Sequence, residues 1–179
     1  RRPGAIRFAT KRNEADKITI MSGVFEGRTT GTPISMLVFN EDQHSKDYSQ
    51  IASCYRPGHA DYTFDCKYGF RDYRGGGRSS GRETIGRVAG GAVALAFLKE
   101  LGIEITAYTR QIGPVAIDNP LSTDLLKLRQ AIMNSEIYMP DEAKTKDAVD
   151  YLSRMTENMD SAGGMVECVV NGVPAGLGD

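Results

Sequence analysis

A segment without hydrophobic periodicity, residues 54–82, constrains the fold of this chain more than any other feature. A non-periodic stretch of this length is unusual in a compact domain unless it is functional or disordered. Disordered segments are poor in aromatic side chains, whereas this one contains Tyr55, Tyr62, Phe64, Tyr68, Phe70 and Tyr73. The sequence therefore predicts an ordered loop at 54–82 that forms a binding or catalytic site.

The next segment is predicted to be a helix at 81–101. Ser80 and Glu83 have the spacing of a capping box, in which Ser80 is the N-cap and Glu83 reaches back to it. Residues 88–98 are small and apolar on nearly every face, which is typical of a buried helix. Gly102 predicts the C-terminal end. We therefore expect a buried small-residue helix at 81–101.

The rest of the chain mixes strand and helix patterns. Strand patterns occur at residues 17–21, 34–39, 103–108 and 165–170. The first two are expected to pair antiparallel. Amphipathic helix patterns occur at residues 121–134 and 141–159. This mixture predicts an α+β fold, a layered β-α-β sandwich with an antiparallel sheet. We expect a single domain over residues 1–179, a length that suits one domain.

The overall charge excludes some classes of partner. The chain has 22 Lys and Arg residues and 23 Asp and Glu residues, a net charge of −1. This balance argues against a nucleic-acid partner, because such proteins usually carry a basic excess. No apolar run reaches the ~20 residues that cross a bilayer, so no membrane partner is expected. From Arg56 to Arg87, however, seven basic residues outnumber four acidic ones, which favours a small anionic ligand bound locally.

The cysteines and histidines are few. An odd set of three cysteines, Cys54, Cys66 and Cys168, argues against a disulfide framework and against a zinc site. The two histidines have no carboxylate cluster near them, so no metal site is expected. This cysteine usage fits a reduced, cytoplasmic setting.

The stretch from Arg74 to Thr84 combines glycines, serines and arginines just before the predicted helix. Glycines let the backbone approach a ligand, and the free N–H groups of a helix N-terminus favour an anion. The guanidinium groups of Arg74, Arg78 and Arg82 can add forked donors that suit phosphate or carboxylate. The stretch is neither a Walker A loop nor a dinucleotide fingerprint. The alternative is a flexible glycine-rich loop and a capped helix that bind nothing.

His59 lies in the turn Pro57-Gly58-His59, with Asp61 two residues later. Histidine exchanges a proton near neutral pH, and a nearby carboxylate or arginine would tune it. The alternative is a structural histidine that only makes hydrogen bonds. The other histidine, His44, lies in a polar stretch and is predicted to be exposed.

Several longer motifs follow one another along the whole chain. They are Arg1-Arg-Pro-Gly4, Ser22-Gly-Val-Phe-Glu-Gly27, Thr29-Thr-Gly-Thr32, Asp47-Tyr48, Arg56-Pro-Gly-His-Ala-Asp-Tyr-Thr63, Lys67-Tyr-Gly69, Arg71-Asp72, Arg74-Gly-Gly-Gly-Arg-Ser-Ser80, Arg82-Glu-Thr84 and Val170 to Gly178. Together, and in this order, they closely resemble the chorismate synthase family. The combination is far more specific than any single glycine-rich loop.

The resemblance implies a lyase that acts at the last step of the shikimate pathway, in aromatic amino acid biosynthesis. The family eliminates phosphate from 5-enolpyruvylshikimate 3-phosphate in a 1,4 sense to give chorismate. The resemblance also implies reduced FMN as the cofactor, although the reaction is redox neutral overall. NADPH is implied as the reductant where a member reduces its own flavin, and a homotetramer is the implied assembly.

The resemblance assigns roles to residues of this sequence. His59 matches one of the family's two catalytic histidines, understood as a proton donor near the flavin or the leaving group. The flavin-binding triplet matches Arg78, Ser79 and Ser80. Arg1, Arg7 and Arg74 match positions that suit the anionic groups of the substrate or NADPH.

The sequence also departs from the family pattern. The family's other catalytic histidine lies in a Gly-Glu-Ser-His-Gly motif that does not occur here, and family members continue well beyond Asp179. Gly81 stands where alanine is usual, and His44 where arginine is usual. We therefore expect an internal part of a longer enzyme that alone binds FMN weakly and does not turn over. The alternative is a non-catalytic module that binds an anion or nucleotide on the same scaffold.

Overall fold

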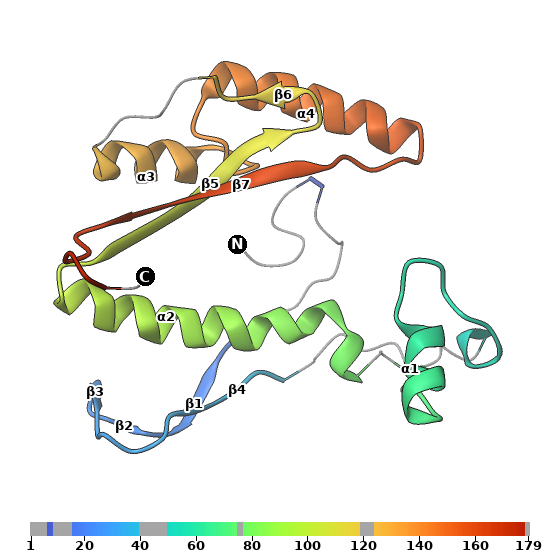
Figure 1. The fold of residues 1–179 in the computed structure, drawn as a ribbon, viewed down its shortest axis with the longest axis horizontal. Coiled ribbons are helices and arrows are strands. Elements are labelled where there is room, and N and C mark those ends of the chain that lie inside the picture. Colours follow the sequence, from blue (N-terminus) through green and yellow to red (C-terminus); the bar gives the residue numbers. More distant parts are fainter. Residues whose placement is uncertain (1–6, 9–15, 40–49, 75–76, 119–123, 178–179) are drawn as a thin grey trace. The chain divides into compact units, whose positions relative to one another are not determined.

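The computed structural model describes residues 7–8, 16–39, 50–74, 77–118 and 124–177 (Figure 1). Their contacts divide the chain into two compact units. One unit contains residues 7–8 and the described residues from Ala94 onward, and the other contains the described residues from Asp16 to Val93. The single domain expected over 1–179 stays a prediction.

The unit that includes the C-terminal half is built on a three-stranded antiparallel sheet in the order β6-β5-β7. Strand β5 (Glu104–Ile112) pairs with β7 (Gly164–Asn171) over its whole length, and with the short β6 (Val115–Ala116) at its far end. The strands predicted at 103–108 and 165–170 are thus confirmed. Strand β5 runs further than predicted because a tight turn at Gly113, with φ +51°, folds it back into β6.

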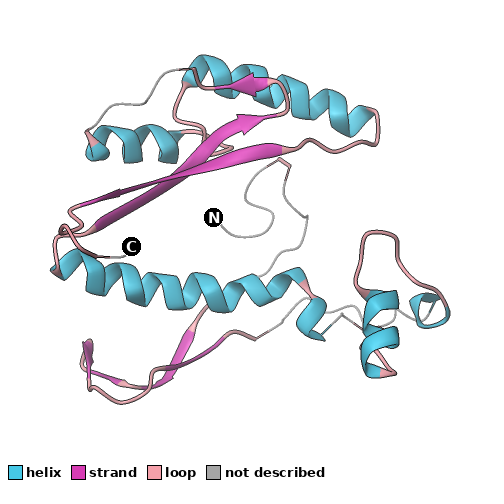
Figure 2. Ribbon diagram, in the orientation of Figure 1, coloured by secondary structure: helices cyan, strands magenta, loops and turns pink. Residues whose placement is uncertain are grey.

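Two helices accompany this sheet, α3 (Leu125–Asn134) and α4 (Glu142–Glu157), as Figure 2 shows. Both begin at an aspartate whose carboxylate accepts N–H groups of the first turn, Asp124 for α3 and Asp141 for α4. The buried core forms between them and the sheet, from Tyr108, Ile117, Leu125, Leu128, Ile132, Ile137, Met139 and Ala148. The predicted helices are confirmed, and α3 begins at Leu125 because its cap is Asp124.

The other unit begins with two short antiparallel pairs. Strand β1 (Thr19–Ser22) pairs with β4 (Ser35–Leu37), as the sequence predicted, and β2 (Val24–Phe25) pairs with β3 (Arg28–Thr29). Gly23 joins β1 to β2 with φ +83°, a conformation that glycine adopts without strain. The α+β class with antiparallel sheets is therefore confirmed.

The described part of segment 54–82 is ordered by polar contacts instead of an apolar core. It follows the 3-10 helix η2 (Gln50–Ser53) and contains a helix that the sequence did not predict, α1 (Asp61–Tyr68). Helix α1 lacks an apolar period, and its one buried residue is Asp61. Arg71 ties the segment together, because its guanidinium donates to the carbonyls of Ile51 and Cys54 and stacks 4.6 Å from the centre of the Tyr55 ring.

Two further 3-10 turns, η3 (Gly77–Ser79) and η4 (Gly81–Glu83), lead into α2 (Thr84–Glu100). The predicted C-terminal end is confirmed as a Schellman motif. The N–H of Ile103 donates to the Leu98 carbonyl and that of Gly102 to the Lys99 carbonyl. Gly102 has the left-handed conformation that this motif requires, with φ +74°.

The predicted burial of the helix at 81–101 is wrong for the described chain. Only Ala89 of α2 is buried, while Val88 and Phe97 are 69% and 64% exposed. An apolar composition shows that a helix can be buried, but burial depends on what packs against it, which the helix sequence does not specify. The β-α-β layering involves both units and stays a prediction.

Candidate functional site

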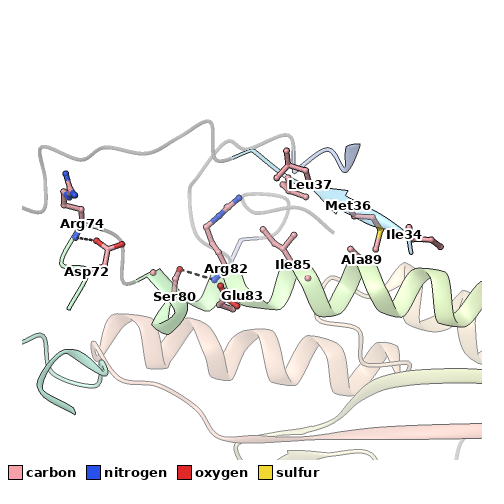
Figure 3. Close-up of a pocket in the computed structure, with 13 residues that line it drawn as sticks. Ile34, Met36, Leu37, Asp72, Arg74, Ser80, Arg82, Glu83, Ile85 and Ala89 are labelled. Carbon is pink, nitrogen blue, oxygen red and sulfur yellow. Dashed lines mark hydrogen bonds between the residues drawn. The ribbon is translucent and has the colours of Figure 1, made fainter. Parts of the chain in front are cut away.

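A cavity of about 630 Å³ lies between β4 and the start of α2 (Figure 3). This volume lies within the range of ~300–1,000 Å³ typical of small-molecule sites. One wall is apolar and includes Ile34, Met36, Ile85 and Ala89. The opposite end is polar and is made by the segment that leads into α2. The cavity therefore offers an apolar wall for a ring and a polar end for charged groups.

The charges at the polar end are balanced. Arg74 and Arg82 line the cavity together with Asp72 and Glu83. Asp72 shapes the loop, because its carboxylate accepts the backbone N–H of Arg74 at 3.0 Å. Arg82 in turn donates to the carboxylate of Asp16 at 3.0 Å. The local basic excess in the sequence is thus partly neutralised where the chain folds.

The start of the helical segment confirms only part of the capping box predicted for Ser80 and Glu83. The Ser80 hydroxyl accepts the N–H of Arg82 at 3.2 Å, and the Ser80 carbonyl accepts the N–H of Glu83 at 3.1 Å. Ser80 is therefore confirmed as the N-cap, of the turn η4. Its own N–H donates to the Gly77 carbonyl at 3.1 Å and not to the Glu83 side chain, so the second half of the predicted capping box is wrong. Because these first N–H groups are already used, side chains are the main groups left for an anion.

The predicted site residues are only partly brought together. Ser80 and Arg74 line the cavity. Ser79 is partly buried on η3 and is not among the lining residues. Arg7 is exposed and belongs to the other unit, where it lines a separate cavity with the end of α4. Arg1, His44 and the side chain of Arg78 lie outside the described residues.

His59 is exposed and is not among the residues that line the cavity. Its ring Nδ1 lies 3.2 Å from the carbonyl oxygen of Pro57. Since a carbonyl can only accept, this contact places the hydrogen on Nδ1 and leaves Nε2 to exchange a proton. Asp61, the carboxylate two residues after His59, binds Arg56 through both of its oxygens.

Sequence reasoning missed Asp16 and the apolar wall on β4. Asp16 lies 66 positions before its partner Arg82, and Ile34 and Met36 read as ordinary strand residues. No local pattern marks such contacts, because they depend on which strand lies beside the helix. Asp72 was noted in the sequence only as part of the motif Arg71-Asp72, and no role was assigned to it.

The residues present fit a ligand that carries a phosphate and a ring system, as FMN does. Ser80 and Arg74 stand at the polar end, and Ile34, Met36 and Ile85 offer apolar surface. A metal is a different matter: within the described ranges, no group of three or more His, Cys, Asp or Glu side chains is placed to hold one. Among the helices that the structure describes, none is both long and apolar enough to span a membrane.

Comparison with known proteins decides the family. The family model for chorismate synthase matches residues 1–179. This chain belongs to the chorismate synthase family. It is 59% identical to a chorismate synthase of Lachnoclostridium phytofermentans and 58% identical to one of Agathobacter rectalis, in each case over all of this chain and 47% of the relative.

A solved structure agrees. The chain resembles a crystal structure of chorismate synthase with a TM-score of 0.72 and 31% identity, over 90% of this chain and 46% of that one. The resemblance inferred from the motifs is therefore confirmed. The chain spans about half the length of the curated relatives it matches.

Proposed function

We propose that this chain is part of a chorismate synthase, a lyase that eliminates phosphate from 5-enolpyruvylshikimate 3-phosphate to give chorismate. The observation that carries the proposal is the family match along all 179 residues. The cavity beside α2 supports it, because it joins an apolar wall to a polar end containing Ser80, Arg74 and Arg82.

The proposed roles follow from the charge changes in the reaction. A carbon–oxygen bond breaks and phosphate leaves with the bonding electrons, while a proton is lost from the carbon skeleton. Cationic groups beside the departing phosphate stabilise its charge in the transition state. We assign this role to Arg74, with Arg1 and Arg7 holding other anionic groups of the substrate or NADPH.

His59 is the proposed proton donor, acting through Nε2. Its Nδ1–H donates to the Pro57 carbonyl at 3.2 Å, so Nε2 is the nitrogen that takes up a proton and, from the protonated imidazolium, donates it. General acid catalysis of this kind contributes roughly 100- to 10,000-fold to a rate. His59 lies outside the described cavity lining, so this role rests on the family motif.

Reduced FMN is the proposed cofactor, held by Arg78, Ser79 and Ser80. When bound, it would take part without net consumption, because the elimination is redox neutral overall. The residues that would hold it are Ser80 at the polar end of the cavity and the apolar wall that includes Ile34, Met36 and Ile85. We further propose a cytoplasmic homotetramer, and activity that belongs to the longer protein and not to the 179-residue chain alone.

The experiment measures chorismate formed from the phosphorylated substrate and reduced FMN, under anaerobic conditions, by the full-length protein and by the 179-residue chain. The full-length protein is expected to be active and the shorter chain inactive. His59→Ala in the full-length protein should lower kcat about 100-fold or more with little change in FMN affinity. Lys67→Gln, on the exposed side of α1, is the control. An inactive full-length protein that still binds an anion would favour the non-catalytic module instead.

A further inference from the structure

Hydrogen bonds between Arg56 and Asp61 close the chain around His59 into a loop. The N–H of His59 donates to the Arg56 carbonyl at 3.3 Å, which closes a four-residue turn. Pro57 occupies the second position and Gly58 the third, with φ +71°. This is the pattern of a type II turn, which requires a positive φ at its third position. The turn fixes the direction in which His59 leaves the backbone.

Three hydrogen bonds from Arg56 to the Asp61 carboxylate close this loop. One carboxylate oxygen of Asp61, Oδ2, accepts the backbone N–H of Arg56 at 3.0 Å and its Nε–H at 2.9 Å. The other, Oδ1, accepts from Nη2 at 2.8 Å. A bidentate pair of this kind fixes geometry as well as charge. Asp61 therefore holds both the backbone and the side chain of the first residue of the turn.

Asp61 is itself well fixed. It is the first residue of α1 and is only 3% exposed. The hydrogen bonds from Arg56 hold the pKa of its carboxyl well below the usual range, so the ionised form persists at neutral pH. Asp61 is the one buried residue of α1, so apolar packing of this helix does not explain its burial. What it contacts is the residue three positions before His59.

We propose that Asp61 is a positioning residue for His59, acting through Arg56 and the Pro57-Gly58 turn. Its carboxylate does not serve as the direct partner of the imidazole. By fixing Arg56 it fixes the turn, and the turn brings the Pro57 carbonyl to the ring Nδ1 at 3.2 Å. This sets which ring nitrogen exchanges a proton and where it points. The inference rests on the proposed role of His59.

The test is a double-mutant cycle in the full-length protein. Asp61→Asn keeps the size of the side chain but removes its charge, and should lower kcat about 10- to 100-fold by displacing His59. The KM for the substrate and the affinity for FMN should change little. In the His59→Ala background, the same substitution should change kcat by less than about twofold, because its effect passes through His59. Equal losses in both backgrounds would overturn the proposal.

The matched control is Asp65→Asn. Asp65 lies one turn along the same helix and contacts Arg71 at 3.7 Å. It should leave kcat within about twofold. Arg56→Lys keeps the positive charge but loses the fork, so it should reproduce the effect of Asp61→Asn and covers the case in which that variant does not fold. Full activity in Arg56→Lys would contradict the proposal.

Hydrogen exchange gives a readout that does not depend on activity. Amide exchange in a peptide spanning residues 54–62 should be faster in Asp61→Asn than in the unsubstituted protein and unchanged in Asp65→Asn. Faster exchange with unaltered kcat would overturn the positioning role while leaving the proposed function intact. If the unsubstituted full-length protein forms no chorismate, the proposed function fails. The positioning role of Asp61 in catalysis then fails too, even if hydrogen exchange shows that Asp61 stabilises the loop between Arg56 and Asp61.

Discussion

The guanidinium of Arg82 donates to the carboxylate of Asp16 at 3.0 Å, across 66 positions of sequence. Both side chains are partly buried, with 24% and 18% of their surfaces exposed. The contact joins the residues that enter β1 to the turn that starts α2. Arg82 also lines the cavity, so the same pair lowers the net positive charge at its polar end.

Asp16→Asn should lower the free energy of unfolding by about 1 kcal/mol, a usual value for a partly exposed charged hydrogen bond. Asparagine tolerates the left-handed backbone of Asp16, where φ is +44°. The loss of stability would therefore come from the removed charge and not from backbone strain. Urea denaturation measures it, with the exposed neighbour Lys17→Gln as the control. The variant Arg82→Gln and the double variant complete the cycle. If the losses of the two single variants add up to the loss of the double variant, the pair is not coupled.

Ser80→Ala should cost about 1 kcal/mol, because it removes the N-cap hydroxyl that accepts the Arg82 N–H. It should also weaken binding of reduced FMN to the full-length protein, as titration would show. Ser80→Asn is the matched variant, since asparagine caps helices as well as serine does. Equal stability of the alanine and asparagine variants would argue against the capping role.

Gly23→Ala and Gly31→Ala form a matched pair in the β1–β4 region. Both glycines have left-handed backbones, with φ +83° and +82°. A Cβ on Gly23 would lie 2.7 Å from both Ile34 Cγ1 and the Pro33 carbonyl oxygen, whereas one on Gly31 meets no atom within 4 Å. Gly31→Ala should therefore cost roughly 1–2 kcal/mol of conformational strain. Gly23→Ala should cost clearly more, because the clash adds to the strain. Thermal denaturation of the two variants would show no difference if the crowding at Gly23 were relieved without cost.

Tyr108→Phe tests the buried hydroxyl that donates to Glu167 on β7. Burial, followed by the hydrogen bond to Glu167, raises the pKa of Tyr108 to about 12. The unfolded tyrosine loses its proton near pH 10, so the stabilisation is complete below about pH 10 and is lost as the pH rises toward 12. The free energy of unfolding should fall less steeply above pH 10 in Tyr108→Phe than in the unsubstituted protein. The exposed Tyr68→Phe should keep the original slope, and an identical slope in all three proteins would contradict the prediction.

Elements with a strong local signal were predictable. The 3-10 turn η4 that leads into α2 begins after Ser80, and α2 ends before Gly102, because capping depends on residues within one turn of each end. Strand β5 was found from its alternation. Helix α1 was missed because its order comes from Arg56, Asp61 and Arg71, and polar contacts leave no hydrophobic period.

The candidate site was predicted in parts. Ser80 and Arg74 line one cavity, while their binding roles stay predictions. The partner of Arg82 and the partner of Asp61 were not predicted, since spacing alone does not say which acid a guanidinium meets. The turn before His59 was readable from Pro57 and Gly58, but the residue that holds it was not.

By itself, the sequence determined the family, the caps at Ser80 and Gly102 and the residue types of the loop before α2, because these depend on local chemistry and on the order of motifs. Only the tertiary structure decided that Arg82 is neutralised by Asp16, that Asp61 holds Arg56, and that α2 is largely exposed in the described chain. Those outcomes depend on which segments meet in space. Residues distant in sequence then compete for the same charged groups, and the contacts formed decide which groups remain for a ligand.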